Sequence, residues 1–373
     1  MDFAFSAEQE QLREIVHDYL SNEAPPSYAR AMMDDPGGFT DKGWDAIAAL
    51  GWPGLAVPEE HGGSGLGYLD LVILAEELGM VVYPGPFLST VGLAIPAILA
   101  TADAVQRDAL LPELAGGAKR ATAAIAEESG AWAADVLTVE ASPAADGFAL
   151  DGTKLFVPDA RSADTIIVAA RIGDDVAFFA LPRDDAGLRI EPMTTVDTTR
   201  KLDVVILDGA RAADDQLLGR KPHPAATFDA VIDQAKTVLA AEMCGCAAAA
   251  LELSVEYVKV REQFGRSIAS FQAIQHKLAD MKVLLENARS LVYYAAWAID
   301  TQASDRRLAA AMAKAFASEA CPRVAAEAIQ VHGGIAFTWE HDLHMFYKRL
   351  KASEVTYGDA TENRALVASL LEL

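Results

Sequence analysis

Three short segments in the last third of the sequence carry residue types that could hold a diphosphate. The first segment contains Arg261 and Phe264, the second begins at Gln272, and the third runs from Gln330 to Gly333-Gly334. An arginine can donate charge-assisted hydrogen bonds to phosphate oxygens, and paired glycines let a backbone approach a ligand closely. Each segment alone could be a simple helix cap, but together they indicate a cradle for a diphosphate-bearing ligand.

Long helices are expected to position these segments. Apolar residues recur at helical spacing over 228–260, 271–301 and 306–331, and shorter stretches follow over 340–351 and 360–371. Arg261 then falls at the end of the first long helix, with Gly265 as its C-terminal stop. Gln272 opens the second helix, and the glycine pair ends the third. Helices of this length are typical of a bundle.

The residues that precede the long helices show two other sequence patterns. Up to about residue 118 the pattern is helical, with Ser6 able to cap a helix over 10–19. Short β-rich runs follow between turn residues, and the dipeptide Asp151-Gly152 is expected to join two of them in a tight turn. The sequence predicts helices over 44–50, 69–78 and 105–114, and strands over 122–126, 137–140, 153–157, 165–169, 176–181, 188–190 and 202–207. Strands at this spacing favour an antiparallel sandwich or barrel.

The charge of the chain excludes several classes of partner. Its 373 residues hold 31 Lys and Arg against 54 Asp and Glu, a formal net charge of −23. Such a surface repels nucleic acids and anionic membranes. No apolar run reaches the roughly 18 residues of a membrane span, and Met1–Glu8 is acidic rather than signal-like. Three cysteines are too few for a disulfide framework. We expect a cytoplasmic protein that binds neither nucleic acid nor membrane.

Two other motifs have plain structural interpretations. The glycine cluster 61–67 follows no buried strand and precedes no Walker lysine, so it is expected to be a helix-entry loop. His341 and His344 lie three apart on an expected helix beside Glu340, a spacing that a metal could use. No other His or Cys cluster offers further ligands, so a hydrogen-bonded helix face is expected there and no metal is assigned.

The sequence strongly resembles the acyl-CoA dehydrogenase family over essentially its whole length. Pro58–Gly63, Glu76–Gly79 and Asp151–Lys154 are similar to signatures of its first two domains, and the three segments described first are similar to its C-terminal signatures. The resemblance implies a mainly α fold with a β-barrel insert. It implies an N-terminal α-helical domain over 1–118, a central antiparallel β-barrel domain over 119–220 and a C-terminal four-helix bundle domain over 221–373.

The same resemblance implies a cofactor and a reaction. The cofactor is FAD, and six positions match the family's FAD contacts: Arg261, Phe264, Gln272, Gln330, Gly333 and Gly334. The reaction is α,β-dehydrogenation of an acyl-CoA thioester, in which a carboxylate takes the α-proton and a hydride leaves the β-carbon for the flavin. The electrons then pass to an electron-transferring flavoprotein. The weakly acidic α-proton requires a desolvated carboxylate with a raised pKa.

The expected base is missing. The family's usual glutamate aligns with Tyr357, and a phenol with a pKa near 10 is a poor base at neutral pH. The alternative glutamate position of some members aligns with Ala235. Glu242 lies seven residues further, about 10.5 Å along the same helix face. It is either a relocated base or a buried glutamate paired with a bundle residue, so the catalytic base remains unknown.

Other departures concern the flavin ring and CoA. The family's flavin-facing hydroxyl is absent at Ala126, Phe156 keeps an aromatic, and Pro158 removes a hydroxyl and a backbone N–H donor. Asp233 and Lys236 lie where the family often contacts CoA, or they are ordinary solvated charges at an exposed helix start.

These losses follow a pattern that favours one hypothesis. In family dimers one subunit holds the flavin ring, and its neighbour reaches across with the elements that this chain keeps. We therefore expect a base-lacking, flavin-completing subunit of a heteromer, as in bacterial steroid side-chain degradation. The alternatives are a self-sufficient homo-oligomer with Glu242 as base, a non-redox acyl-CoA-binding or scaffold subunit, and branches such as nitroalkane oxidation. Ala-rich helices suit a dimer of dimers, either homomeric or heteromeric; the acyl group cannot be inferred.

Overall fold

The computed structural model describes residues 5–373, and the chain divides into two compact units. A helical unit comprises the N-terminal residues up to Ala31 together with 68–83 and 236–373. A β-containing unit comprises 32–67 and 84–235. Met1–Ala4, from the segment expected not to be a signal peptide, lie outside the described residues.

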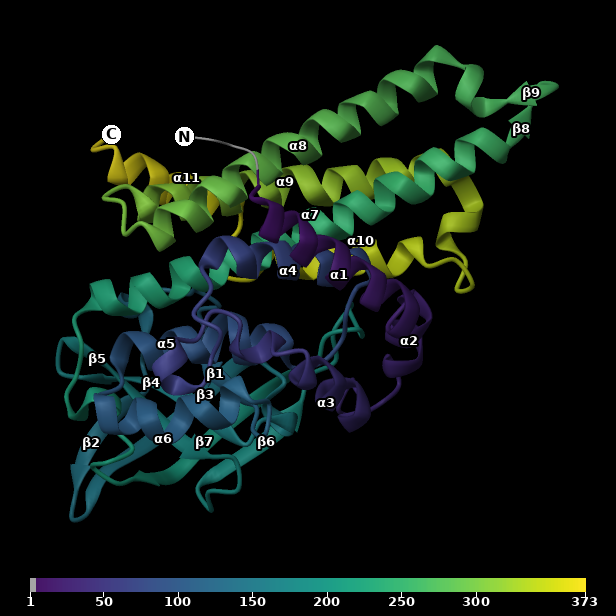
Figure 1. Cartoon of the computed structure of the whole chain (residues 1–373). Coiled ribbons are helices and arrows are strands. Elements are labelled where there is room, and N and C mark those ends of the chain that lie inside the picture. Colours follow the sequence, from purple (N-terminus) through teal and green to yellow (C-terminus); the bar gives the residue numbers. More distant parts are fainter. Residues whose placement is uncertain (1–4) are drawn as a thin grey trace. The chain divides into compact units, whose positions relative to one another are not determined.

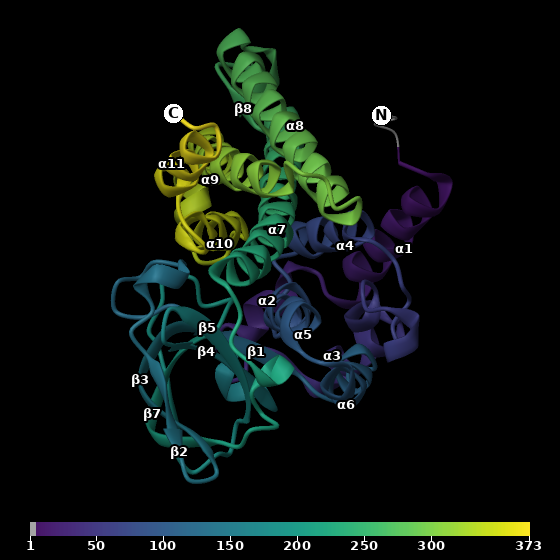
Figure 2. The same ribbon diagram turned by 90° about the vertical axis from the view of Figure 1, so that its left-hand side faces the viewer.

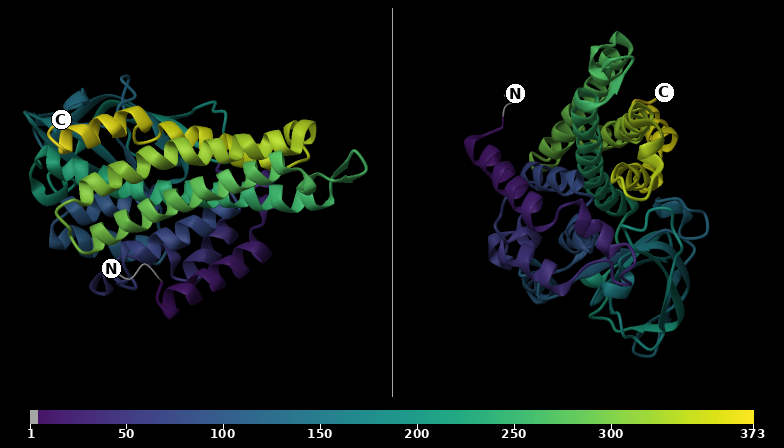
Figure 3. Two further views of the ribbon diagram at one scale, coloured as in Figure 1. Left: turned by 90° about the horizontal axis from the view of Figure 1, so that it is seen from above. Right: turned by 90° about the vertical axis from the view of Figure 1, so that its right-hand side faces the viewer.

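The helical unit is built on long antiparallel helices that lie side by side (Figure 1; Figure 3, left). Helix α8 packs on α9, and α9 also packs on α10 and α11. Local capping starts several helices: Ser6 caps α1 in a capping box with Gln9, as expected, and Asp359 caps α11 in a box with Glu362. The helices are α1 (Ala7–Glu23), α2 (Pro26–Met32), α4 (Tyr68–Met80), α7 (Ala225–Val260), α8 (Gln272–Asp300), α9 (Arg306–His332), α10 (Leu343–Val355) and α11 (Ala360–Leu370).

Helices α4 and α7 cross at a pair of glycines. A Cβ atom on Gly245 would lie 1.8 Å from the carbonyl oxygen of Glu76, and one on Gly79 would lie 2.2 Å from that of Glu242. Only glycine lets two helix backbones approach so closely. This crossing fixes the depth at which Glu76 and Glu242 enter the bundle.

The β-containing unit combines a seven-stranded sheet with short helices. Figure 2 shows the sheet curling on itself. Its order is β1-β4-β2-β3-β7-β6, with β5 paired to β4. The elements are α3 (Asp41–Ala49), a π-helical turn (Leu88–Ala94) that continues into α5 (Ile95–Thr101), α6 (Ala104–Ala115), β1 (Ala121–Ala124), β2 (Glu140–Ala144), β3 (Gly147–Pro158), β4 (Thr165–Ile172), β5 (Asp175–Pro182), β6 (Leu188–Pro192) and β7 (Leu202–Ala212).

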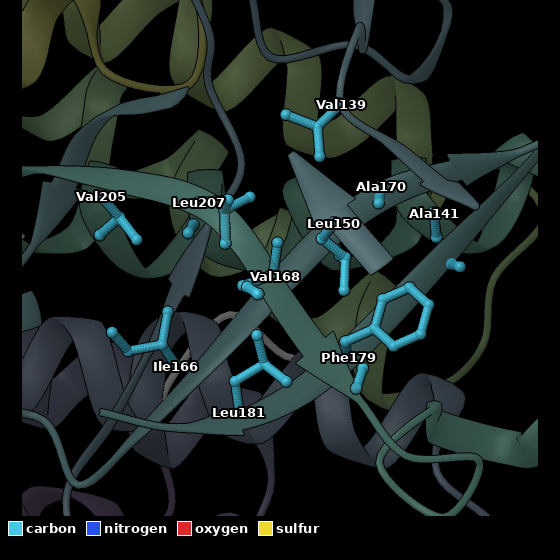
Figure 4. Close-up of a cluster of buried hydrophobic side chains, with 14 of the residues drawn as sticks. Val139, Ala141, Leu150, Ile166, Val168, Ala170, Phe179, Leu181, Val205 and Leu207 are labelled. Atoms are coloured by element: carbon cyan, nitrogen blue, oxygen red, sulfur yellow. The ribbon is translucent and has the colours of Figure 1, made fainter. Parts of the chain in front are cut away.

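The inside of the curled sheet holds an apolar core. Leu150, Val168, Phe179 and Val205 come from four different strands and are fully buried (Figure 4). Phe148 packs edge-on against Phe179, with ring centroids 5.4 Å apart. This core gathers one face of the strands, since alternate side chains point to one face of a sheet.

Most strand pairs are antiparallel, as predicted, but β4 runs parallel to β1 and β2. The chain between β1 and β4 is long enough to return in the same direction, which a tight hairpin would not allow. Along the sequence, helical N- and C-terminal regions therefore flank a central curled β-sheet.

The prediction of a turn at Asp151-Gly152 is wrong. Both residues lie inside β3, where the register shifts between Leu150 and Gly152. The Asp151 carboxylate accepts a hydrogen bond of 2.7 Å from the backbone N–H of Gly209 on β7. The dipeptide thus forms a β-bulge, and the actual turn lies between Ala144 and Gly147.

Among residues 5–373, only α7 is long and apolar enough to span a membrane. Most of its apolar stretch is buried within the structure. The same length and composition are found in the core helix of a bundle.

Candidate functional site

One end of the helical bundle brings together the segments expected to hold a diphosphate. Helix α7 ends at Val260, directly before Arg261, and α9 ends at His332, directly before Gly333. The Tyr257 ring stacks on His332 with centroids 4.3 Å apart, and its hydroxyl donates to the His332 carbonyl. Because Tyr257 lies one helical turn before Arg261, this contact places Arg261 and Gly333 at the same end of the bundle.

A small hairpin connects α7 to α8 at this end (Figure 1). Strands β8 (Glu262–Gln263) and β9 (Arg266–Ser267) pair antiparallel around Phe264 and Gly265, whose φ angles are 54° and 74°. Two positive φ values are typical of a type I′ hairpin turn. The prediction of Gly265 as a helix stop is therefore wrong, because the helix ends five residues earlier. The turn leaves the Phe264 side chain 92% exposed.

The two glutamines lie at the same end. Gln272 is the first residue of α8 and Gln330 lies in the last turn of α9, and both are exposed. An ion pair between Lys277 and Glu327 joins the adjacent turns of these two helices. The structure thus gathers all six predicted FAD contacts at one bundle end: Arg261, Phe264, Gln272, Gln330, Gly333 and Gly334.

The chemistry of these groups fits the adenosine diphosphate part of FAD. A Cβ atom on Gly333 or Gly334 would meet nothing within 4 Å, so this stretch of backbone is open to a ligand. Arg261 is exposed and offers a forked cation, and Phe264 offers an exposed aromatic face. A cation and open backbone suit phosphate oxygens, while amide and aromatic groups suit a nucleoside.

Side chains hold the loop that follows the glycine pair. Arg30 donates to the Trp339 carbonyl and to the Asp342 carboxylate. The Trp339 ring stacks on His344, with centroids 4.8 Å apart and planes 4° from parallel, and Lys348 lies over the same ring at 4.5 Å. These contacts connect the loop to the first turns of α10.

The two histidines considered as metal ligands do not share a helix face. His341 precedes α10, and its Nδ1 accepts a hydrogen bond from the N–H of Leu343, whereas His344 lies within the helix. Burial lowers the pKa of His344, as it does that of His332. No group of three or more metal-ligating side chains occurs in the part of the chain that the structure describes.

The position of the family's usual base holds Tyr357, between α10 and α11. Its side chain is buried, and its backbone has a φ of 59°, which is unusual for a residue with a side chain. Glu242 is also buried, and it forms an ion pair of 2.5 Å with Arg349, which is 1% exposed. Arg349 also reaches the Tyr83 carbonyl at 3.4 Å. Glu242 therefore has the geometry of a paired structural carboxylate, one of its two predicted roles.

Two further residues differ from their expected environment. Asp233 and Lys236 are each 7% exposed, whereas an exposed helix start was one of the expectations for them. Both residues lie within α7, which begins at Ala225, and both are buried there. Ala235 is buried too and carries no titratable group.

The β-containing unit holds a buried ion pair that the sequence analysis missed. Lys154 on β3 is fully buried, and its Nζ lies 2.6 Å from Oε1 of Glu127. Glu127 also accepts from the N–H groups of Thr138 and Val139. Burial lowers the pKa of Lys154 to about 8 against the opposing effect of Glu127. Burial works to raise the pKa of Glu127, but Lys154 and Thr138 outweigh it and hold that pKa below its usual range.

This ion pair supports the two segments that align with the family's flavin-ring contacts. The N–H of Leu155 donates to the Ala126 carbonyl at 2.8 Å, so the segments after β1 and within β3 lie side by side. A register shift between Lys154 and Val157 gives Phe156 a φ of 56° and leaves it 39% exposed. The carbonyl of Pro158 accepts from Thr122. The Phe156 ring is thus partly exposed to solvent, but Ala126 and Pro158 supply no side-chain hydroxyl beside it.

Comparisons with known proteins agree with this arrangement. Residues 6–118 match "Acyl-CoA dehydrogenase, N-terminal domain" and residues 227–371 match "Acyl-CoA dehydrogenase, C-terminal domain". The acyl-CoA dehydrogenase IpdE2 of Mycolicibacterium smegmatis is 35% identical over 360 residues, which is 96% of each chain.

Two solved structures extend the likeness. A variant of the steroid ACAD Tcur3481-Tcur3483 is 31% identical, with a TM-score of 0.88 over 98% of each chain. A chain of the ChsE4-ChsE5 complex from Mycobacterium tuberculosis is 25% identical, with a TM-score of 0.91 over 100% of this chain and 99% of that one. The chain therefore belongs to the acyl-CoA dehydrogenase family of oxidoreductases, whose cofactor is FAD.

Proposed function

We propose that this chain is the base-lacking subunit of a heteromeric acyl-CoA dehydrogenase, and that it completes a flavin site on a partner chain. One observation carries the proposal: the base position holds Tyr357, and the nearest suspect carboxylate, Glu242, is engaged by the buried Arg349. In contrast, the six residues predicted to contact FAD are kept at the bundle end, on open backbone and exposed side chains.

The division of labour follows from what each group can do. When bound, FAD supplies the acceptor for the hydride that leaves the acyl β-carbon. Arg261 would bind the diphosphate, the open backbone at Gly333-Gly334 would allow close approach, and Phe264 would cover an apolar surface. The α-proton needs a carboxylate base, and a Glu-bearing partner chain would supply it. Electrons would then pass to an electron-transferring flavoprotein.

The relatives support this assembly and its substrate class. One solved neighbour is described as a complex of two differently named chains, and another as a steroid ACAD. We infer an acyl-CoA thioester with a steroid-derived acyl group as substrate and a dimer of dimers as the assembly.

Expression of the chain alone and beside a Glu-bearing family member tests the proposal. We expect a chain that holds little flavin alone and that gains FAD, tetrameric mass and acyl-CoA turnover in the co-expressed complex. Turnover by the chain alone would instead establish a self-sufficient enzyme. A colourless, inactive complex would show that the chain is a non-redox scaffold subunit.

A matched pair of variants tests the FAD surface within that complex. Arg261→Ala removes the proposed diphosphate contact, and we expect a loss of about tenfold or more in FAD affinity, as for one charge-assisted hydrogen-bonding group. Arg306→Ala is the control, because Arg306 is equally exposed but begins α9, at the opposite end from Gly333. Equal FAD affinity in the two variants would show that Arg261 does not contribute to FAD binding.

A further inference from the structure

A buried lysine engages the loop that carries Tyr357. Lys314 lies on α9 and is fully buried. Its Nζ donates to Oγ of Ser318 at 2.7 Å, to the Glu354 carbonyl at 3.0 Å and to the Gly358 carbonyl at 2.8 Å. In its protonated form the group has three hydrogens, and these three acceptors then use its full donor capacity. Two of the three are backbone carbonyls on either side of Tyr357.

Other buried groups hold the same backbone. The side-chain amide of Asn363 donates to the carbonyls of Gly358 and Asp359, each at 2.9 Å, and the Ser318 hydroxyl also lies 3.2 Å from the Glu354 carbonyl. Tyr357 sits between these anchors with its positive φ. A strained backbone conformation persists only where the surroundings over-determine it.

We propose that Lys314 is a positioning residue that fixes the segment 354–359 and thereby holds Tyr357 at the place where the family carries its base. This inference rests on the proposed function only in one respect, which is that the position of Tyr357 is read as a base position without a base. The anchoring itself stands on the contacts within the helical unit. The lysine acts through the loop backbone, and the position of the phenol follows from it.

The charges around Lys314 allow a test by pH. The groups that face it are Lys236 from α7, Glu354 from α10, and Asp359 and Glu362 from α11. Burial, followed by Lys236, lowers the pKa of Lys314 to about 7 against the opposing effect of the three acids. If the loop opens, the lysine becomes solvated and its pKa returns to about 10.4.

The sign of the pH effect follows from proton binding. Between about pH 7 and 10 the open loop binds more protons than the closed loop, so raising the pH favours the closed state. The opening constant is expected to fall by up to about tenfold per pH unit in this range. Below pH 7 both states are protonated, and the constant is expected to be flat.

Hydrogen–deuterium exchange of the full-length chain measures this opening. We expect protection of peptides covering 354–359, corrected for intrinsic exchange, to rise from pH 7 to 9. Lys314→Met keeps a long apolar side chain but carries no ionisable group, so we expect the pH dependence of exchange in these peptides to be lost. Lys282→Met is the control, because Lys282 is an exposed lysine of α8 whose ion pair with Glu286 lies on the same helix.

Three results would overturn the inference: pH-independent protection in the unmodified chain, an unchanged pH dependence in Lys314→Met, or an equal loss of the pH dependence in Lys282→Met. If Lys314→Met does not fold, Ser318→Ala decides, since loss of that acceptor is expected to speed exchange about fivefold in the same peptides. None of these measurements needs flavin or a partner chain. Turnover by the isolated chain would thus refute the proposed function and leave this inference standing.

Discussion

The ion pair of Glu242 and Arg349 gives the sharpest test of where the base is. Glu242→Gln keeps the shape of the side chain and removes its charge. Arg349, which is 1% exposed, then loses the carboxylate that it contacts at 2.5 Å inside the bundle. Removing one partner of a buried pair costs about 3–5 kcal/mol. The glutamine oxygen can still accept a hydrogen bond, so we expect the lower end, about 3 kcal/mol of lost unfolding free energy.

A double-mutant cycle separates pairing from catalysis. Arg349→Met alone leaves a buried carboxylate and is expected to cost about 3–5 kcal/mol, whereas the double variant removes both charges together. We expect the double variant to be at least about 2 kcal/mol more stable than the sum of the single costs predicts. Urea unfolding followed by circular dichroism measures all four chains.

Turnover of the co-expressed complex provides the refuting result. If the pair is structural, the double variant is expected to regain turnover along with stability. A Glu242→Gln chain that keeps its stability while the complex loses all turnover would show that Glu242 is the base. Additive costs in the cycle would refute the electrostatic reasoning.

Three more outcomes follow from the contacts described above. Lys154→Met leaves Glu127 buried without its cation and is expected to cost about 3 kcal/mol at pH 7. Because Lys154 holds the pKa of Glu127 low, the stability deficit of this variant is expected to shrink as the pH falls from about 5 to 3, measured by urea unfolding. Gly245→Ala gains about 1 kcal/mol of helix propensity but meets the Glu76 carbonyl, and an overpacking cost near 3 kcal/mol leaves it about 2 kcal/mol less stable. Phe264→Ser changes the melting temperature of the free chain little, since surface substitutions stay within about 0.5 kcal/mol, but it is expected to weaken the assembled complex in mass measurements.

The elements were predictable where one local rule dominated. Short β-rich runs between turn residues placed strands such as β4 and β5 within a few residues, and Ser6 marked the start of α1. The errors came where two rules competed. Asp151-Gly152 has the composition of a hairpin turn, but pairing with β7 on one side and β2 on the other absorbs it as a bulge. Gly265 suits a helix stop and a hairpin turn equally well, and only the structure distinguishes them.

The candidate site could be proposed from the sequence where the chemistry follows from residue type. Arg261 and the glycine pair were proposed because cations and open backbone suit phosphates, and the structure places them at one bundle end. The partners of buried charges were not predictable, because Lys154 and Glu127 are 27 residues apart and Arg349 and Glu242 are 107 apart. A lysine inside the expected strand 153–157 is the clue that could have drawn attention to Lys154.

The hairpin between α7 and α8 is also a protease-sensitive site whose cleavage would report on assembly. A chymotrypsin-like enzyme cuts after large aromatic residues on accessible turns, and Phe264 is 92% exposed at the tip of a two-residue turn. The free chain would be nicked there early, giving a fragment that ends at Phe264. In the proposed heteromer this turn is covered by the neighbouring subunit and its nucleotide. The rate of cleavage after Phe264 would therefore measure the fraction of chains that are assembled, independently of flavin absorbance and turnover.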